Sequence, residues 1–122
     1  MTRSRIRRLH IAGADFVCSV RASTSAAAPG GVVFSAYATG HRLRLHFTGS
    51  PGQGRLAGDA GLDHGSLRTA DGRWINLHRP AVMRALVLAG LARAGAAGAA
   101  AELDGWRVLD AATLPDAEPD AP

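Results

Sequence analysis

The sequence predicts an α+β domain in which an antiparallel sheet of β-hairpins packs against one C-terminal helix. Short runs of alternating apolar and polar residues are separated by glycine-containing turns, and one longer apolar segment with helical spacing follows them. Of the 122 residues, 47% are hydrophobic and 20% are charged, which excludes a wholly disordered chain and is enough for one core. We expect a single domain over 1–112 and a disordered, acidic, proline-rich tail over 113–122.

Two hairpins are predicted in the first half of the chain, with turns at Gly13–Ala14 and Gly40–His41. Their strands are 5–12, 15–22, 32–39 and 42–48. A third hairpin joins 66–70 to 73–78 through Asp71–Gly72, a strong turn dipeptide.

The segment 80–94 is predicted to form the helix, because Pro80 suits the first helical turn and apolar residues recur with helical spacing. Leu88 and Leu91 lie away from the predicted core-facing stripe, so either other parts of the chain cover them or they form a homodimer contact. After the helix, 105–110 can form a final strand. The core-facing stripe consists of Val82, Met83, Leu86, Val87, Gly90 and Ala94.

The charge is unevenly distributed along the chain. All 14 basic residues are arginine, and 13 of them stand in 1–100 against four acidic residues, a formal charge of +9. Residues 101–122 carry one arginine against six acidic residues, a formal charge of −5. A basic body of this kind favours an anionic partner, either a nucleic-acid backbone or an acidic protein surface.

Alternation within the strands separates a core face from a polar face. In the run RLRLHFT at 42–48, the leucines share one face with Phe47, which leaves the arginines and the histidine on the other. If all strands form one sheet, the polar face combines arginines, histidines and aromatic side chains, which can bind phosphates and stack on rings. Its members are Arg8, His10, Arg21, Tyr37, Arg42, Arg44, His46, Trp74, Asn76 and His78.

The candidate binding site is taken from this face and from the junction before the helix. Free N–H groups at a helix N-terminus attract anions, and His78 and Arg79 precede Pro80 at that point. The eight candidate residues are Arg42, Arg44, His46, Tyr37, Trp74, Asn76, His78 and Arg79.

No metal and no cofactor is expected. Cys18 is the single cysteine, so it forms no internal disulfide and no metal framework. Asp63–His64 has no supporting motif and is interpreted as part of a solvated loop. The surrounding glycine-rich segment 49–65 lacks the lysine of a phosphate-binding loop, although it can act as a lid.

Three functions fit these patterns. The first is a small soluble binding or accessory protein that engages an anionic partner through the polar sheet face. The second is a small enzyme or small-molecule-binding protein, in which the loop 49–65 and a dimer mate enclose a pocket over the same face. The third is a structural subunit that dimerises through Leu88 and Leu91.

A cytoplasmic location is expected. The basic residues 1–8 are followed by no apolar stretch of signal-peptide length, and no apolar run reaches the roughly 18 residues that cross a membrane.

The runs RRLHIAG, HRLRLHF and WINLHRPAVMRALVLAGLA, together with DGWRVLDA, give the chain a family likeness over about 5–112. It resembles small uncharacterised proteins of GC-rich actinobacteria that carry an N-L-[NH]-x-P-x-V-x-R-A-L segment, here 76–86. The resemblance implies a strand–helix junction at this segment and no particular activity.

Overall fold

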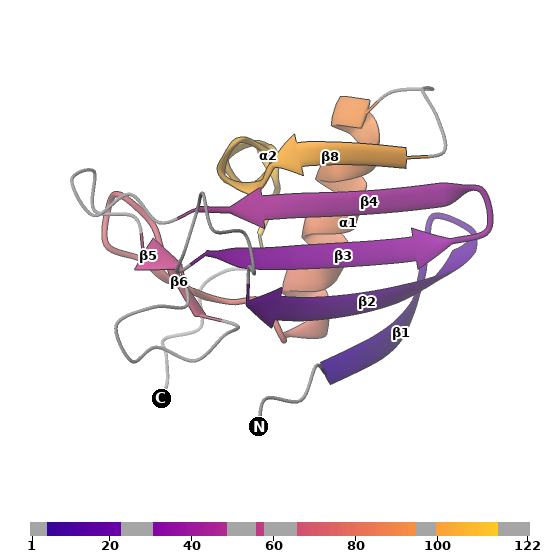
Figure 1. Cartoon of the computed structure of the whole chain (residues 1–122), viewed down its shortest axis with the longest axis horizontal. Helices are drawn as coiled ribbons and strands as arrows, with labels where there is room; N and C mark the ends of the chain where they lie inside the picture. Colours follow the sequence, from indigo (N-terminus) through magenta and orange to yellow (C-terminus); the bar gives the residue numbers. More distant parts are fainter. Residues whose placement is uncertain (1–4, 23–30, 49–55, 58–65, 95–99, 115–122) are drawn as a thin grey trace.

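The computed structural model describes residues 5–22, 31–48, 56–57, 66–94 and 100–114. They form an α+β fold, as predicted, with a five-stranded sheet in the order β1-β2-β3-β4-β8 and the helix α1 across one of its faces (Figure 1). The strands of this sheet are β1 (Arg5–Ile11), β2 (Ala14–Ala22), β3 (Val32–Ala38), β4 (His41–Phe47) and β8 (Ala100–Asp104). The two helices are α1 (Pro80–Ala94) and α2 (Gly105–Ala111).

The first two hairpins are confirmed, with each turn one residue earlier than predicted. β1 and β2 are closed by the pair Ile11 and Ala14, so the turn residues are Ala12 and Gly13. Both have positive φ, 52° and 83°, as a type I′ turn requires. The second hairpin is closed by Ala38 and His41 around Gly40, whose φ is also positive.

The strand predicted at 105–110 is wrong. The final strand is β8, five residues earlier, and the predicted segment forms α2 instead. The Asp104 carboxylate accepts a hydrogen bond from the Trp106 backbone N–H at 3.0 Å and so caps this helix. Trp106, Val108 and Leu109 are buried, and their spacing brings them to one side of a helix.

β8 runs parallel to β4, while all other pairs in this sheet are antiparallel. The chain reaches it through α1, and a helical crossover is the ordinary way to return a strand in the same direction beside an earlier one. Two acidic residues of the C-terminal part of the chain, Glu102 and Asp104 on β8, therefore lie beside the arginine-containing strand β4.

The core lies between the sheet and α1. The apolar sides of the strands and the predicted helical stripe meet there, except that Ala94 is half-buried. Trp106 closes one end, with its ring edge-on to Phe47 at 5.3 Å and its indole N–H donating to the Thr48 carbonyl at 2.9 Å. The largest buried side chains include Phe16, Phe34, Phe47, Leu43, Leu45, Met83 and Leu86.

The third hairpin forms, but it belongs to a separate three-stranded sheet. β6 (Ser66–Arg68) and β7 (Trp74–Asn76) pair around Gly72, with β5 (Leu56–Ala57) on the other side of β6. Figure 1 shows this small sheet at one end of the large one. The assumption of a single sheet is therefore wrong.

Both strands of this hairpin are shorter than predicted, and the Thr69 backbone N–H donates to the Arg73 carbonyl across the turn at 2.9 Å. The Thr69 hydroxyl also binds the Asp71 carboxylate inside the turn.

Several predictions lie outside the described residues. These are the tail beyond Leu114 and the loop 49–65 apart from β5, including Asp63–His64. On α1, Leu88 is 41% exposed, whereas Leu91 is half-buried and packs against the core. No helix within the described ranges is long and apolar enough to cross a membrane.

Candidate binding face

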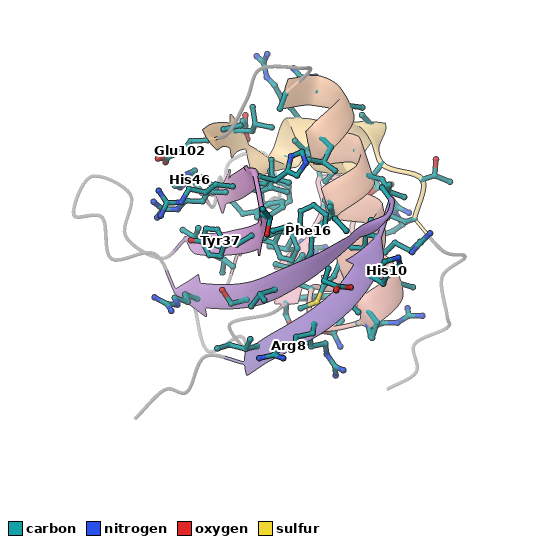
Figure 2. All side chains as sticks on the ribbon, turned by 90° about the vertical axis from the view of Figure 1, so that its right-hand side faces the viewer. Arg8, His10, Phe16, Tyr37, His46 and Glu102 are labelled. Carbon is teal, nitrogen blue, oxygen red and sulfur yellow. The ribbon has the colours of Figure 1, made fainter. Side chains whose placement is uncertain are left out.

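We call the side of the five-stranded sheet opposite α1 the outer sheet face. Strand alternation fixes its membership, and the cross-strand pairs confirm it from β1 to β8. Figure 2 shows Tyr37, His46 and Glu102 pointing away from α1. The outer sheet face consists of Ile6, Arg8, His10, Asp15, Val17, Ser19, Arg21, Val33, Ser35, Tyr37, Arg42, Arg44, His46, Glu102 and Asp104.

One row of neighbours crosses four strands of this face with a cation at each end. Arg8 pairs with Val17, Val17 with Tyr37, and Tyr37 with Arg42. The two central side chains are 36% and 37% exposed, and the Arg42 guanidinium lies 5.5 Å from the Tyr37 ring centroid, within cation–π distance. Three strand spacings separate the ends, about 14 Å. We call this the Arg8–Arg42 row.

The neighbouring row of cross-strand pairs has two small residues at its centre. Ser19 and Ser35 lie opposite each other on β2 and β3, and each is only 7% exposed although no described element covers the face. At the β1 end of this row Ile6 is 62% exposed, the most exposed large apolar side chain in the described ranges.

The far end of the same row contains an ion-pair cluster that the sequence did not reveal. The Glu102 carboxylate lies 2.8 Å from His46 Nε2 and 3.8 Å from an Arg44 guanidinium nitrogen. The hydrogen bond from His46, followed by the charge of Arg44, lowers the pKa of Glu102 below its ordinary value. Arg44 Nε is buried without a hydrogen-bond partner among the described residues, so the contact of this guanidinium with Glu102 is made through its terminal nitrogen.

The cluster changes the charge available on the outer sheet face. Arg44 is paired with Glu102, and His10 forms a 2.8 Å contact with Asp15. Arg8, Arg21 and Arg42 form no ion pair with a described acidic residue, so they are the cations that this face offers to a partner.

Four of the eight predicted site residues share this face, namely Tyr37, Arg42, Arg44 and His46. The other four do not. Trp74 and Asn76 lie on β7 of the small sheet, and His78 and Arg79 lie in the turn before α1.

Asn76 organises that turn. Its side-chain oxygen accepts from the His78 N–H at 2.9 Å, and its carbonyl accepts from the Arg79 N–H at 3.2 Å. Trp74 and Asn76 were expected on the outer sheet face because alternation shows which face of a strand a residue occupies, but not which sheet the strand joins.

The described residues with catalytic potential are few. Cys18 is fully buried, and burial raises the pKa of its thiol to about 11, which disfavours the reactive thiolate. Within the described ranges, no three His, Cys, Asp or Glu side chains are grouped so that they can hold a metal ion.

Comparison of the chain with protein-family models, with curated proteins and with solved structures gives no match. The resemblance to small actinobacterial proteins stays a prediction.

Proposed function

We propose that this protein is a binding protein whose outer sheet face engages an anionic surface of a partner macromolecule. The observation that supports it best is the Arg8–Arg42 row. Two arginines without an acidic partner among the described residues flank two exposed apolar side chains, one of them aromatic. A partner that presents anionic groups about 14 Å apart can contact both arginines and cover Val17 and Tyr37 between them.

The arrangement favours a binding surface over an enclosed pocket. Tyr37 and Arg42 are exposed, and both described helices lie away from the part of the face that they occupy (Figures 1 and 2). The small-molecule function would require these side chains to be enclosed, so it is the second candidate.

The test measures binding of two fluorescent polyanions, polyglutamate and a 20-nucleotide oligothymidylate, over a series of salt concentrations. Replacing Arg8 and Arg42 together by alanine removes two cationic contacts. For single-stranded DNA, the slope of log affinity against log salt falls by about 0.7 per contact, so we expect a loss of about 1.4.

Arg93→Ala is the matched control, because Arg93 is exposed in the last turn of α1, on the other side of the sheet. We expect its slope to equal that of the wild type. A loss of about 0.7 in Arg93→Ala, the same per arginine as in the double variant, would mean that net charge rather than this face drives binding. Absence of binding to both polyanions at low salt would overturn the proposed function.

A further inference from the structure

β1 forms one edge of the five-stranded sheet, and no described strand pairs with its other side. The two-residue turn makes Ile11 and Ala14 a hydrogen-bonded pair, and such pairs recur at every second residue along the hairpin. Leu9 and Arg7 therefore bond to β2. Arg8, which lies between them, and Ile6, on the other side of Arg7, direct their backbone N–H and C=O groups away from β2, toward the open edge.

The structure supports this assignment at the end of the strand near the turn. His10 belongs to the same set as Ile6 and Arg8, and its carbonyl accepts a hydrogen bond from an Arg84 guanidinium nitrogen at 3.2 Å. An α1 side chain thus caps the edge at His10. The backbone groups of Ile6 and Arg8 have no such cap among the described residues.

The side chains on this stretch define what can pair with it. Ile6 is largely exposed, and Arg7 and Arg8 are exposed on opposite faces of the strand without an ion pair to a described acidic residue. Arginines on an edge discourage pairing between two copies of the same strand, because like charges across a strand pair are destabilising. Carboxylates at the same positions would be attracted.

We infer that an extended acidic segment of a partner protein adds to β1 as a sixth strand. Its backbone bonds to the free groups of Ile6 and Arg8, its carboxylates face Arg7 and Arg8, and an apolar side chain covers Ile6. This inference rests on the proposed function and names the class of partner. Strand addition extends the outer sheet face by one strand beside Arg8, so the same partner can reach the Arg8–Arg42 row.

The experiment uses a labelled eight-residue peptide built from the repeat Val-Glu-Glu and measures its affinity for the full chain. In either strand direction this spacing can place a valine opposite Ile6 and glutamates opposite Arg7 and Arg8. Ile6→Pro removes the edge-facing N–H and leaves the hydrogen bonds between β1 and β2 intact, because Ile6 donates none of them. Ile6→Ala is the matched control, since it loses the side chain and keeps the N–H. We expect Ile6→Pro to bind about tenfold more weakly than Ile6→Ala, the effect of one hydrogen bond of about 1.4 kcal/mol.

A second arm leaves the protein unchanged. Two peptides are N-methylated on alternate residues, one on the odd and the other on the even positions. In a paired strand only one set of amides faces β1, so we expect one methylated peptide to lose binding and the other to keep it. This arm decides the question if Ile6→Pro fails to fold by circular dichroism.

Each other outcome overturns the inference in an identifiable way. Equal weakening by both methylation patterns, or equal affinity of Ile6→Pro and Ile6→Ala, excludes backbone pairing. If polyanion binding still depends on Arg8 and Arg42 in that case, the proposed function stands alone. Binding of the oligothymidylate and not of the peptide identifies a nucleic-acid partner. A wild-type dimer that Ile6→Pro dissociates identifies a second copy as the added strand.

Discussion

His46 on β4 and Glu102 on β8 are 56 positions apart in the sequence, and their side chains meet at 2.8 Å between Nε2 and Oε1. The parallel register produces this contact, because it places Glu102 opposite Arg44, the neighbour of His46 on the outer sheet face. An acidic residue near the C-terminus thereby reduces the charge of a strand that reads as basic by itself.

The first prediction is that the pKa of Glu102 depends on His46. The hydrogen bond from His46 and then the charge of Arg44 lower it below the ordinary 4.5. Because the folded-state pKa is the lower one, the stabilisation is fully present above about pH 4.5 and is lost as pH falls through the folded value. We expect carboxyl-carbon NMR to give a midpoint below 4.5 in the wild type and closer to 4.5 in His46→Ala. An unchanged midpoint in His46→Ala would contradict the assignment, with His41→Ala on the same strand as control.

Removing the Glu102 charge is expected to strengthen polyanion binding. Glu102→Gln frees Arg44 and makes the outer sheet face more positive by one charge. Because exposed ion pairs are weak and screened by salt, we expect affinity for polyglutamate to rise modestly at low salt and the gain to disappear as salt is added. Asp110→Asn on α2 removes the same charge outside this face and serves as control. A weaker or unchanged affinity in Glu102→Gln would show that the partner does not contact Arg44.

The faces of the first four strands could be predicted from sequence, because alternation is a local property. Leu43 and Leu45 are buried and Arg42 is exposed, as the run at 42–48 predicts. The neighbour of β4 could not be predicted in the same way. β8 is the short run AAELD, and its alternation is too weak to mark a strand or to name a partner far away in the chain.

The misplacement of Trp74 has a related cause. Ile75 is buried and its neighbours are exposed, so the alternation along β7 predicts the two faces of this strand correctly. Which sheet a short hairpin joins depends on contacts with distant segments, and here Leu67, Ile75 and Leu77 bury themselves at the end of the main core. This single tertiary step separates Trp74 and Asn76 from the outer sheet face.

Two glycines that pack against the core are expected to respond differently to alanine. A Cβ on Gly105 would stand 2.7 Å from three atoms of the Phe47 ring, which itself packs against Trp106. We expect Gly105→Ala to lower the free energy of unfolding by about 1–3 kcal/mol, the usual cost of overpacking. The measurement is urea denaturation.

Gly90→Ala is the comparison within the same core. Its Cβ would meet the flexible end of the Leu43 side chain at 2.7 Å, and alanine favours the helix over glycine by about 1 kcal/mol. We therefore expect a small net change in the urea midpoint. Equal losses in the two variants would show that the Phe47 ring moves aside as easily as Leu43 does.

Cys18 is expected to be unreactive in the folded protein. It lies on β2, the strand between β1 and β3, and its side chain is fully buried. Burial raises the pKa of its thiol to about 11. Few molecules carry a thiolate at pH 8, and reagents cannot reach it. We expect a thiol-specific disulfide reagent to react at least tenfold more slowly in buffer than in 8 M urea. Equal rates in the two solvents would place Cys18 on the surface.

A homodimer through α1 stays a prediction. Of the two predicted contact residues, only Leu88 is exposed. Leu91 packs against the core, so it is available to a partner only in part. On the solvent side of α1, Leu88 is accompanied by exposed Ala81 and Ala92, and Arg84 is the charged neighbour. This helix face is therefore more apolar than an isolated surface helix requires.

We expect sedimentation analysis of the wild type to show a mass that rises with protein concentration. Leu88→Glu is expected to keep the monomer mass, because burial of two glutamates in the contact between the α1 helices would be strongly unfavourable. Thr113→Glu adds the same charge at an exposed position outside α1 and is expected to leave association unchanged. A monomeric wild type would end the prediction. Association that persists in Leu88→Glu and disappears in Ile6→Pro would instead identify β1 as the contact between copies.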